Sequence, residues 1–280
     1  MAIKLYPSPG HFLRDKSAFF EKYEVQAQLN RGNAAAHMYE PCTPALLFGR
    51  VELSGKPVLL FGNTLPRHLC LNAAPDAAGI DKAITELAGY LHENSIEITG
   101  VTGRDSLCRV FMKAYDGEFR LREALDIMVL ETLIVPPPCP GTVQKAAMSD
   151  LDLIVDWKCA LIREAIGEEP VPEQLRETTL DQLKRSVVWL MRDPSGEPVS
   201  MANSGRMLER GACVSGVYTP PEHRGKGYCQ NTVAALCREL LACGKSYVTL
   251  FVDKKNPISN RVYRKIGFDI LEDSSDYRIV

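Results

Sequence analysis

The sequence predicts a mixed α/β (α+β) fold, in which a mixed central sheet is flanked by helices, in a chain of two domains. Helical periodicity alternates with short apolar and β-branched segments along the chain. A length of 280 residues suits two domains better than one. The proline-rich segment 136–140 should be stiff, because proline neither continues a helix nor donates to a sheet. We therefore expect two domains, at 1–138 and 139–280.

The first half combines an N-terminal helical pattern with several short strand patterns. Its apolar residues recur either at helical spacing or in short runs bounded by turn residues. The expected elements are a helix at 11–29, strands at 45–51 and 57–61 joined by a hairpin turn at 53–56, a helix at 80–91, a strand at 96–101, a helix ending near residue 114, and a buried strand at 126–134.

The second half has the order α-α-β-β-β-α-β-α-β after an edge strand at 142–147. Ser149 is the expected N-cap of its first helix, because acidic residues follow in the first turn. The remaining expected elements are a helix at 173–185, strands at 186–192, 199–206 and 212–219, a helix at 228–242, a strand at 247–253, a helix at 256–266 and a strand at 276–280.

The composition is that of an ordinary globular protein, with 45% hydrophobic and 24% charged residues. The net charge of −2, without a basic stripe, argues against nucleic-acid binding. No signal-peptide pattern or apolar run long enough to span a bilayer is present, which favours a soluble cytoplasmic protein without membrane contact. The nine cysteines lack C-x-x-C and zinc-site spacing, so we expect free thiols and no metal site.

The most informative segment is the loop between the strand ending near Thr219 and the helix beginning near Tyr228. Gly225 and Gly227 allow a tight turn and a close approach of backbone to a ligand. The free N–H groups of the next helix form an anion site, to which Arg224 and Lys226 add positive charge. A pyrophosphate fits such a site, although a simple glycine-containing β–α turn would also explain the pattern.

The strand before this loop also has an unusual end. Pro220 and Pro221 cannot donate hydrogen bonds, so pairing with a neighbouring strand should weaken there. A strand whose partner diverges exposes N–H and C=O groups. An amide-containing chain such as pantetheine could pair with those groups.

These motifs resemble those of the GNAT N-acetyltransferase superfamily. The segment 224–229 resembles the family's acetyl-CoA loop, [Gln/Arg]-x-x-Gly-x-[Gly/Ala], with Cys229 in the place of the last small residue. The segment 256–268 resembles the family's Asn…Asn-x-x-Tyr-x-x-x-Gly-Phe pattern, and the strand at 247–253 resembles the one that diverges to open the cofactor cleft. The resemblance covers about 186–280, and 142–185 fits the family's variable first elements.

The resemblance implies a role for each matching residue. Tyr263 would act as a general acid toward the departing CoA thiolate, unless it is only a packed aromatic. The residues expected to contact acetyl-CoA are Val217, Tyr218, Thr219, Arg224, Gly225, Lys226, Gly227, Tyr228, Cys229, Gln230, Asn256 and Asn260.

The family's usual chemistry is direct attack of an amine on the thioester, without an acyl-enzyme. The amine must first lose a proton, and Glu222 is the acid nearest the loop. Glu222 could instead be a solvated strand-end residue, and Glu209 is a second candidate. The backbone N–H of Tyr218 could polarise the thioester carbonyl. Cys213 and Cys229 lack a histidine base in their local motifs, which argues against a covalent route.

The first half also resembles a GNAT domain, one that has lost the cofactor loop. Residues 98–105 occupy the place of the strand and loop without the motif's residue order. The whole chain is similar to bacterial predicted acetyltransferases with a GNAT-like N-terminal domain. The expected function is N-acetyl transfer to a small-molecule or protein amine. Two alternatives stay open. The protein could be an acyl-CoA-binding regulatory module without turnover, or its acyl donor could be longer than acetyl-CoA.

Overall fold

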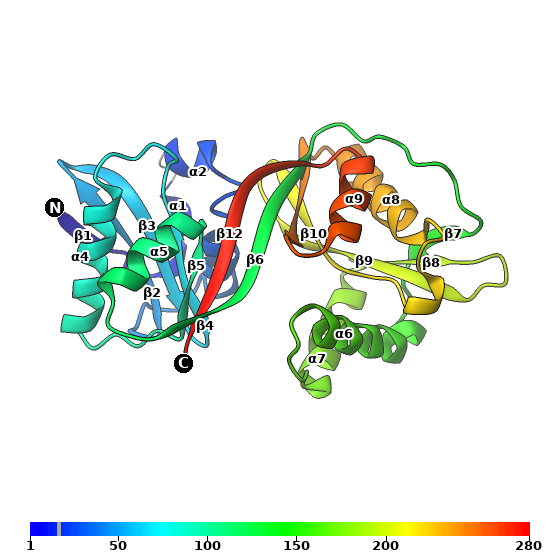
Figure 1. The fold of residues 1–280 in the computed structure, drawn as a ribbon, viewed down its shortest axis with the longest axis horizontal. Coiled ribbons are helices and arrows are strands. Elements are labelled where there is room, and N and C mark those ends of the chain that lie inside the picture. The colour runs from blue at the N-terminus through cyan, green and yellow to red at the C-terminus, as the bar shows by residue number, and fades with distance from the viewer. Residues whose placement is uncertain (16–17) are drawn as a thin grey trace. The chain divides into compact units, whose positions relative to one another are not determined.

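The computed structural model describes residues 1–15 and 18–280 and divides the chain into two compact units (Figure 1). The first comprises Met1–Leu125 with Glu272–Val280, and the second comprises Asp126–Leu271. Two long strands, β6 (Phe119–Leu130) and β12 (Asp269–Ile279), contain residues of both units. The boundaries between the two units therefore fall inside β6 and β12 and not in loops. The proline segment, where we expected the boundary, lies inside the second unit.

The fold is mixed α+β, as predicted. The described residues form a sheet of twelve strands in the order β1-β2-β3-β4-β5-β12-β6-β11-β10-β9-β8-β7. The pairs β4–β5 and β10–β11 are parallel, whereas hairpins such as β2–β3 and β8–β9 are antiparallel. The sheet is therefore mixed, as expected of a fold with crossover helices between some strands and hairpins between others.

The first unit begins with a strand and three short helices, followed by a hairpin-rich segment and two longer helices. Its elements before β6 are β1 (Ala2–Leu5), α1 (Pro9–Arg14), α2 (Ala18–Lys22), α3 (Gln28–Ala36), β2 (Leu46–Leu53), β3 (Lys56–Thr64), β4 (Arg67–Asn72), α4 (Ile80–Glu93), β5 (Gly100–Gly103) and α5 (Asp105–Ala114).

The single helix predicted at 11–29 is wrong, because this segment contains separate short helices. Residues 16 and 17 of the predicted helix lie outside the described residues. The rings of Phe12 and Phe20 pack edge to face with centroids 5.1 Å apart. In a continuous helix, eight residues would separate them by about 12 Å along the axis, so the break lets both rings enter one cluster.

Other boundaries in the first unit also differ from those expected. Strands β1 and β4 were not predicted, and β4 begins with polar Arg67 and His68. The strand expected at 96–101 is formed by 100–103, and Ile96 and Ile98 instead reach the core from the segment before it. Short apolar runs place residues in the core without fixing where the strand pairing begins.

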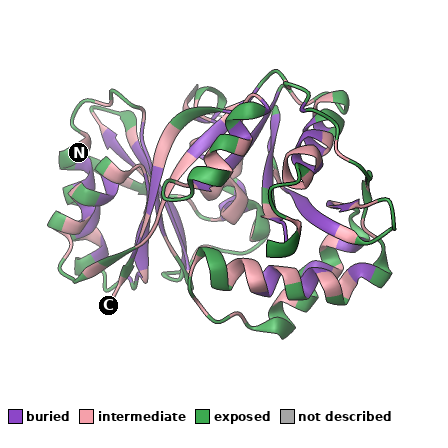
Figure 2. Ribbon diagram, turned by 45° about the vertical axis from the view of Figure 1, so that its right-hand side comes forward, coloured by how far each residue is buried: buried purple, intermediate pink, exposed green. Residues whose placement is uncertain are grey.

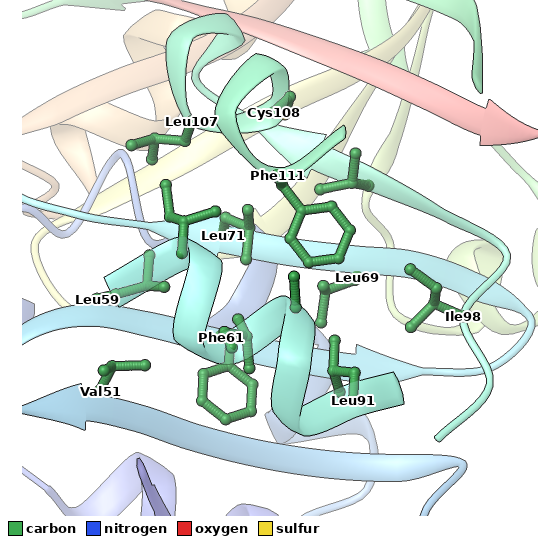
Figure 3. Close-up of a cluster of buried hydrophobic side chains, with 14 of the residues drawn as sticks. Val51, Leu59, Phe61, Leu69, Leu71, Leu91, Ile98, Leu107, Cys108 and Phe111 are labelled. Atoms are coloured by element: carbon green, nitrogen blue, oxygen red, sulfur yellow. The ribbon is translucent and has the colours of Figure 1, made fainter. Parts of the chain in front are cut away.

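The first unit buries hydrophobic side chains on both faces of its strands. Figure 3 shows Phe61, Leu71 and Phe111 among the side chains enclosed between the sheet and helices α4 and α5. Alternate strand residues, such as Phe48 and Leu60, pack against the N-terminal helices in a second cluster. Because successive strand residues face opposite sides, both faces of this sheet are covered.

The second unit continues with the elements predicted for the second half. They are β7 (Thr142–Lys145), a 3₁₀ turn (Met148–Asp150), α6 (Leu151–Ala165), α7 (Pro172–Lys184), β8 (Val188–Arg192), β9 (Pro198–Met207), β10 (Gly211–Tyr218), a second 3₁₀ turn (Pro221–His223), α8 (Tyr228–Ala242), β11 (Tyr247–Asp253) and α9 (Pro257–Lys265).

Ser149 is not the N-cap of α6, contrary to our prediction. It lies within the 3₁₀ turn, and Asp150 is the residue that precedes α6. The Asp150 carboxylate accepts a hydrogen bond from the N–H of Ala147 at 2.9 Å and pairs with Arg192 at 2.6 Å. This buried acid therefore fixes the helix start. The two long strands also extend further than predicted, since 119–130 and 269–279 replace 126–134 and 276–280.

The second unit has one hydrophobic cluster on each face of its strands. Much of its central strands is buried (Figure 2). Helices α8 and α9 cover one face, and α6 and α7 cover the other. In β10 the alternation sends Val217 toward the α8–α9 cluster and Tyr218 toward the α6–α7 cluster. The end of β10 therefore contacts both layers.

A buried lysine joins the two helices α6 and α7. Lys158 is 8% exposed, and its ammonium group donates to Thr179 Oγ1 at 2.8 Å and to the side-chain oxygen of Gln182. No salt bridge to Lys158 occurs among the described residues. Burial without a counter-charge lowers the pKa of Lys158 from about 10.5 to about 8.

This lowered pKa should make stability depend on pH in a defined window. Between about pH 8 and 10.5 the unfolded chain holds the Lys158 proton and the folded protein does not, so stability rises with pH. Relative to Lys158→Met, the native protein should gain up to about 1.4 kcal/mol per pH unit there. Urea unfolding of both proteins at several pH values measures this. The prediction is contradicted if the unfolding free energies of the native protein and of Lys158→Met change equally with pH. Lys184→Met, which replaces an exposed lysine at the end of α7, is the control.

Candidate functional site

The parallel strands β10 and β11 separate partway along their length. Their pairing runs from Gly211 opposite Tyr247 to Cys213 opposite Thr249. Yet β10 continues to Tyr218 and β11 continues to Asp253. The later backbone N–H and C=O groups of β10 therefore have no partner from β11. The strands diverge as we expected, and this leaves the edge of β10 open beyond Cys213.

Strand β10 also bulges at the place where it diverges. Its register with β9 shifts between Ser215 and Tyr218, and Gly216 has a φ of +58°. A Cβ at Gly216 would lie 2.8 Å from the Asn203 side-chain nitrogen. Glycine is therefore required here for both its backbone conformation and its small size.

The loop after β10 ends at the uncapped N-terminus of helix α8. Gly225 and Gly227 have φ values of +78° and +84°, and Gly227 is the N-cap of α8 without a side-chain cap. The first turn of α8 contains no acidic residue. The N–H groups of Tyr228, Cys229 and Gln230 therefore point out of a fifteen-residue helix without an intrahelical partner. This cradle suits a pyrophosphate.

Arg224 is held on the loop by a carboxylate that the sequence did not reveal. Its guanidinium donates to the carbonyl of Thr219 at 2.9 Å and pairs with Glu164 of α6 at 2.6 Å. Glu164 also accepts the Tyr218 hydroxyl at 2.9 Å. Burial and this hydrogen bond raise the pKa of Tyr218. Glu164 lies 60 residues before Arg224, so no local motif could have linked them.

The side chain of Tyr263, a residue of α9, packs against α8, and the thiol of Cys229 in the first turn of α8 is near it. Tyr263 is 7% exposed, and its ring packs edge to face on Phe268 at 5.9 Å. Burial raises the pKa of Tyr263 well above its usual value, and the nearby thiols of Cys229 and Cys237 add to this effect. The structure therefore brings Tyr263 and Cys229 together, and the phenol stays protonated.

The cysteines near the cleft are poor nucleophiles. Burial raises the pKa of Cys229 to about 11 and also raises that of Cys213. A thiol needs to lose its proton before it attacks, so both groups are inactive as nucleophiles near neutral pH.

Asn256 and Asn260 use their side chains to build the turn between β11 and α9. Asn256 caps α9 by accepting the N–H of Ser259 at 3.0 Å. Asn260 donates to the carbonyls of Asp253 at 2.9 Å and Asn256 at 2.8 Å. Both side chains thus stabilise the turn that follows β11.

The two candidates for the general base, Glu222 and Glu209, lie at opposite ends of β10. Glu222 is exposed on the short turn 221–223, beside the end of β10, and its charge contributes to the raised pKa of Tyr218. Glu209 precedes the opposite end of β10. Only Glu222 therefore lies with the other candidate site residues.

The described part of the chain offers neither a cluster of metal ligands nor a membrane-spanning helix. No group of three or more His, Cys, Asp or Glu side chains there could hold a metal ion. None of its helices is both long and apolar enough to cross a bilayer.

Comparisons with known proteins agree with this geometry. The sequence profile described as the acetyltransferase (GNAT) family matches residues 152–268, which include the loop, Tyr263 and most of α6. No curated protein matches the chain.

Several solved structures share the fold over the full length. A GCN5-related N-acetyltransferase from Sphaerobacter thermophilus is 15% identical with a TM-score of 0.64, covering 99% of this chain and 94% of that one. A GNAT-family acetyltransferase from Colwellia psychrerythraea is 12% identical with a TM-score of 0.59 and full coverage of both chains. A tandem GNAT protein from the clavulanic acid biosynthesis pathway is 12% identical with a TM-score of 0.55, covering 99% and 97%.

The family profile covers the divergent strands, the glycine loop and Tyr263, and the full-length matches include a tandem GNAT protein. Residues 152–268 therefore match the GNAT acetyltransferase family, and the whole chain has the fold of these solved GNAT structures.

Proposed function

We propose that this protein transfers the acetyl group of acetyl-CoA to a primary amine by direct attack. The main support is the arrangement of two strands, one helix terminus and one tyrosine. The strands β10 and β11 diverge toward the uncapped N-terminus of α8, and Tyr263 lies beside the first turn of that helix. Such a cleft joins an anion cradle to open strand edges and a proton donor, which are the parts needed to hold and use a CoA thioester.

The chain's own residues fit the CoA group along its length. The loop residues Gly225, Lys226 and Gly227, with Arg224 and the first residues of α8, would hold the pyrophosphate. The backbone of 217–219 would pair with the pantetheine amides. Asn256 and Asn260 shape the wall of the cleft through the turn that they stabilise. When bound, acetyl-CoA supplies an activated acyl group.

Tyr263 acts as the proton donor in this proposal. Burial keeps the phenol of Tyr263 protonated, so it has a proton to give to a thiolate leaving group. The protonated thiols of Cys213 and Cys229 favour direct attack over an acyl-enzyme. Glu222 is the proposed base, acting through water on the acceptor ammonium. The acceptor class is a small-molecule or protein amine.

The first unit takes a supporting role in this proposal. It has helices on both faces of its strands, as the second unit does. The segment around Gly103 and Arg104 contains no second anion cradle, since Arg104 is paired with Glu272 and bonded to the carbonyl of Ala73. We propose that the first unit is a GNAT-like domain without cofactor binding and that the second is catalytic.

The proposal is tested by calorimetric titration with acetyl-CoA and by an assay of CoA release with a panel of amines. We expect acetyl-CoA binding and amine-dependent CoA release. Binding without release for any amine would favour the acyl-CoA-binding regulatory module. Absence of binding would refute both functions.

The ion pair between Glu164 and Arg224 gives a further prediction. Glu164 competes with a phosphate for the Arg224 guanidinium, and a partly exposed pair is worth about 0.2–1 kcal/mol. Glu164→Gln should therefore strengthen acetyl-CoA binding up to about fivefold, while its amide oxygen still accepts the Tyr218 hydroxyl. Calorimetry measures this, with Glu169→Gln of the exposed Arg163 pair as control. Weaker or unchanged binding would contradict it.

A further inference from the structure

A second concave site lies on the outer side of α9. It is a cavity of about 610 Å³ that is lined by residues of α9, β6 and β12 and by Lys254, which follows the end of β11. This volume is in the range of small-molecule sites. All of its lining residues belong to the second unit. They are Asp126, Lys254, Pro257, Asn260, Arg261, Arg264, Lys265 and Ile270.

The charge of this α9 groove is strongly positive. Four of its side chains are cationic and one is a carboxylate. The carboxylate, Asp126, lies 3.6 Å from Lys254. The other three cations, Arg261, Arg264 and Lys265, are exposed and have no salt bridge to any described residue. Three uncompensated cations converging on one cavity favour a ligand with several negative charges.

The cations of the groove lie apart from the proposed proton donor, although Asn260 adjoins both sites. Arg261, Arg264 and Lys265 are exposed on the outer side of α9. Tyr263 and Ile266 are on the opposite, buried face, which packs with α8. A ligand in the groove would therefore lie across α9 from the proton donor.

The side chains that line the α9 groove indicate which negatively charged groups its ligand would carry. Arginine forks recognise phosphate oxygens in pairs, and lysines add point charges. Pro257 and exposed Ile270 provide an apolar surface beside the cations. We propose that the α9 groove binds a small molecule carrying two or more phosphate groups. This inference does not rest on the proposed acetyltransferase activity.

The test is calorimetric titration of the full chain with inorganic tripolyphosphate at low ionic strength. The native protein should bind it, and the double substitution Arg261→Ala with Arg264→Ala should weaken binding about tenfold or more. Lys265→Gln should weaken it less, because one point charge is removed. All three side chains are exposed, so folding should survive, and circular dichroism verifies this.

Two control variants distinguish tripolyphosphate binding in the α9 groove from binding at the start of α8 or to exposed lysines elsewhere. Gly227→Asp disrupts the anion cradle of α8, so the tripolyphosphate binding that persists in this variant reports on the α9 groove alone. Lys82→Ala with Lys184→Ala removes two exposed lysines outside the groove and should have no effect. The proposal is overturned if the native protein does not bind, if the arginine variant binds normally, or if Gly227→Asp abolishes binding. A failed acetyl-CoA titration alone leaves it standing.

Discussion

Replacement of Tyr263 by phenylalanine should lower kcat about 10²- to 10⁴-fold and leave the Kd for acetyl-CoA unchanged. The ring stays in place against Phe268, so the packing between α8 and α9 is kept. Only the proton donor is lost. Within the described part of the chain the Tyr263 hydroxyl makes no hydrogen bond, so its removal should not destabilise the fold. Steady-state kinetics and calorimetry measure the two effects separately.

The pH profile gives this prediction a second readout. Because the pKa of Tyr263 lies well above its usual value, its ionisation should cause no fall in kcat up to about pH 10. Tyr247→Phe is a matched control, since Tyr247 is equally buried but lies where β10 and β11 still pair. Unchanged turnover in Tyr263→Phe would show that this tyrosine is only a packed aromatic. Lost acetyl-CoA binding would place its role in the cleft wall.

The features predicted well from the sequence are those set by neighbouring residues. The glycines at 225 and 227 specify a left-handed turn, and the apolar pattern of 228–242 specifies the helix that follows it. The divergence of β11 from β10 agreed with the prolines that follow β10. Each of these signals lies within a few residues of the structure that it determines.

The features that the sequence did not reveal depend on distant contacts. Glu164 reaches Arg224 across 60 residues, and no pattern within α6 marks it. The break in the predicted N-terminal helix follows from the packing of Phe12 on Phe20, which periodicity alone does not encode. Likewise, β6 and β12 extend between units through residues of mixed burial. Tertiary packing decides such boundaries, so local patterns locate the elements better than their ends.

Gly227→Asp should weaken acetyl-CoA binding by about 100-fold or more while the protein stays folded. A Cβ at this position would lie 3.6 Å from that of Cys139, an ordinary contact. Aspartate tolerates the left-handed conformation better than most residues, and its charge at the helix N-terminus is favourable by about 0.3–1 kcal/mol. Strain and dipole effects therefore largely offset each other. The carboxylate occupies the cradle that the pyrophosphate needs, and it repels the phosphates directly.

Gly244→Asp isolates this charge effect from backbone strain. Gly244 has a φ of +88°, nothing lies within 4 Å of an added Cβ, and it follows the other end of α8. The two variants therefore share the same residue change and nearly the same backbone conformation, but only Gly227 adjoins the free N–H groups. We expect calorimetry to show normal acetyl-CoA binding for Gly244→Asp and none for Gly227→Asp. Equal loss in both would mean that strain, rather than a phosphate cradle at the start of α8, accounts for the effect, and normal binding in both would place the pyrophosphate elsewhere.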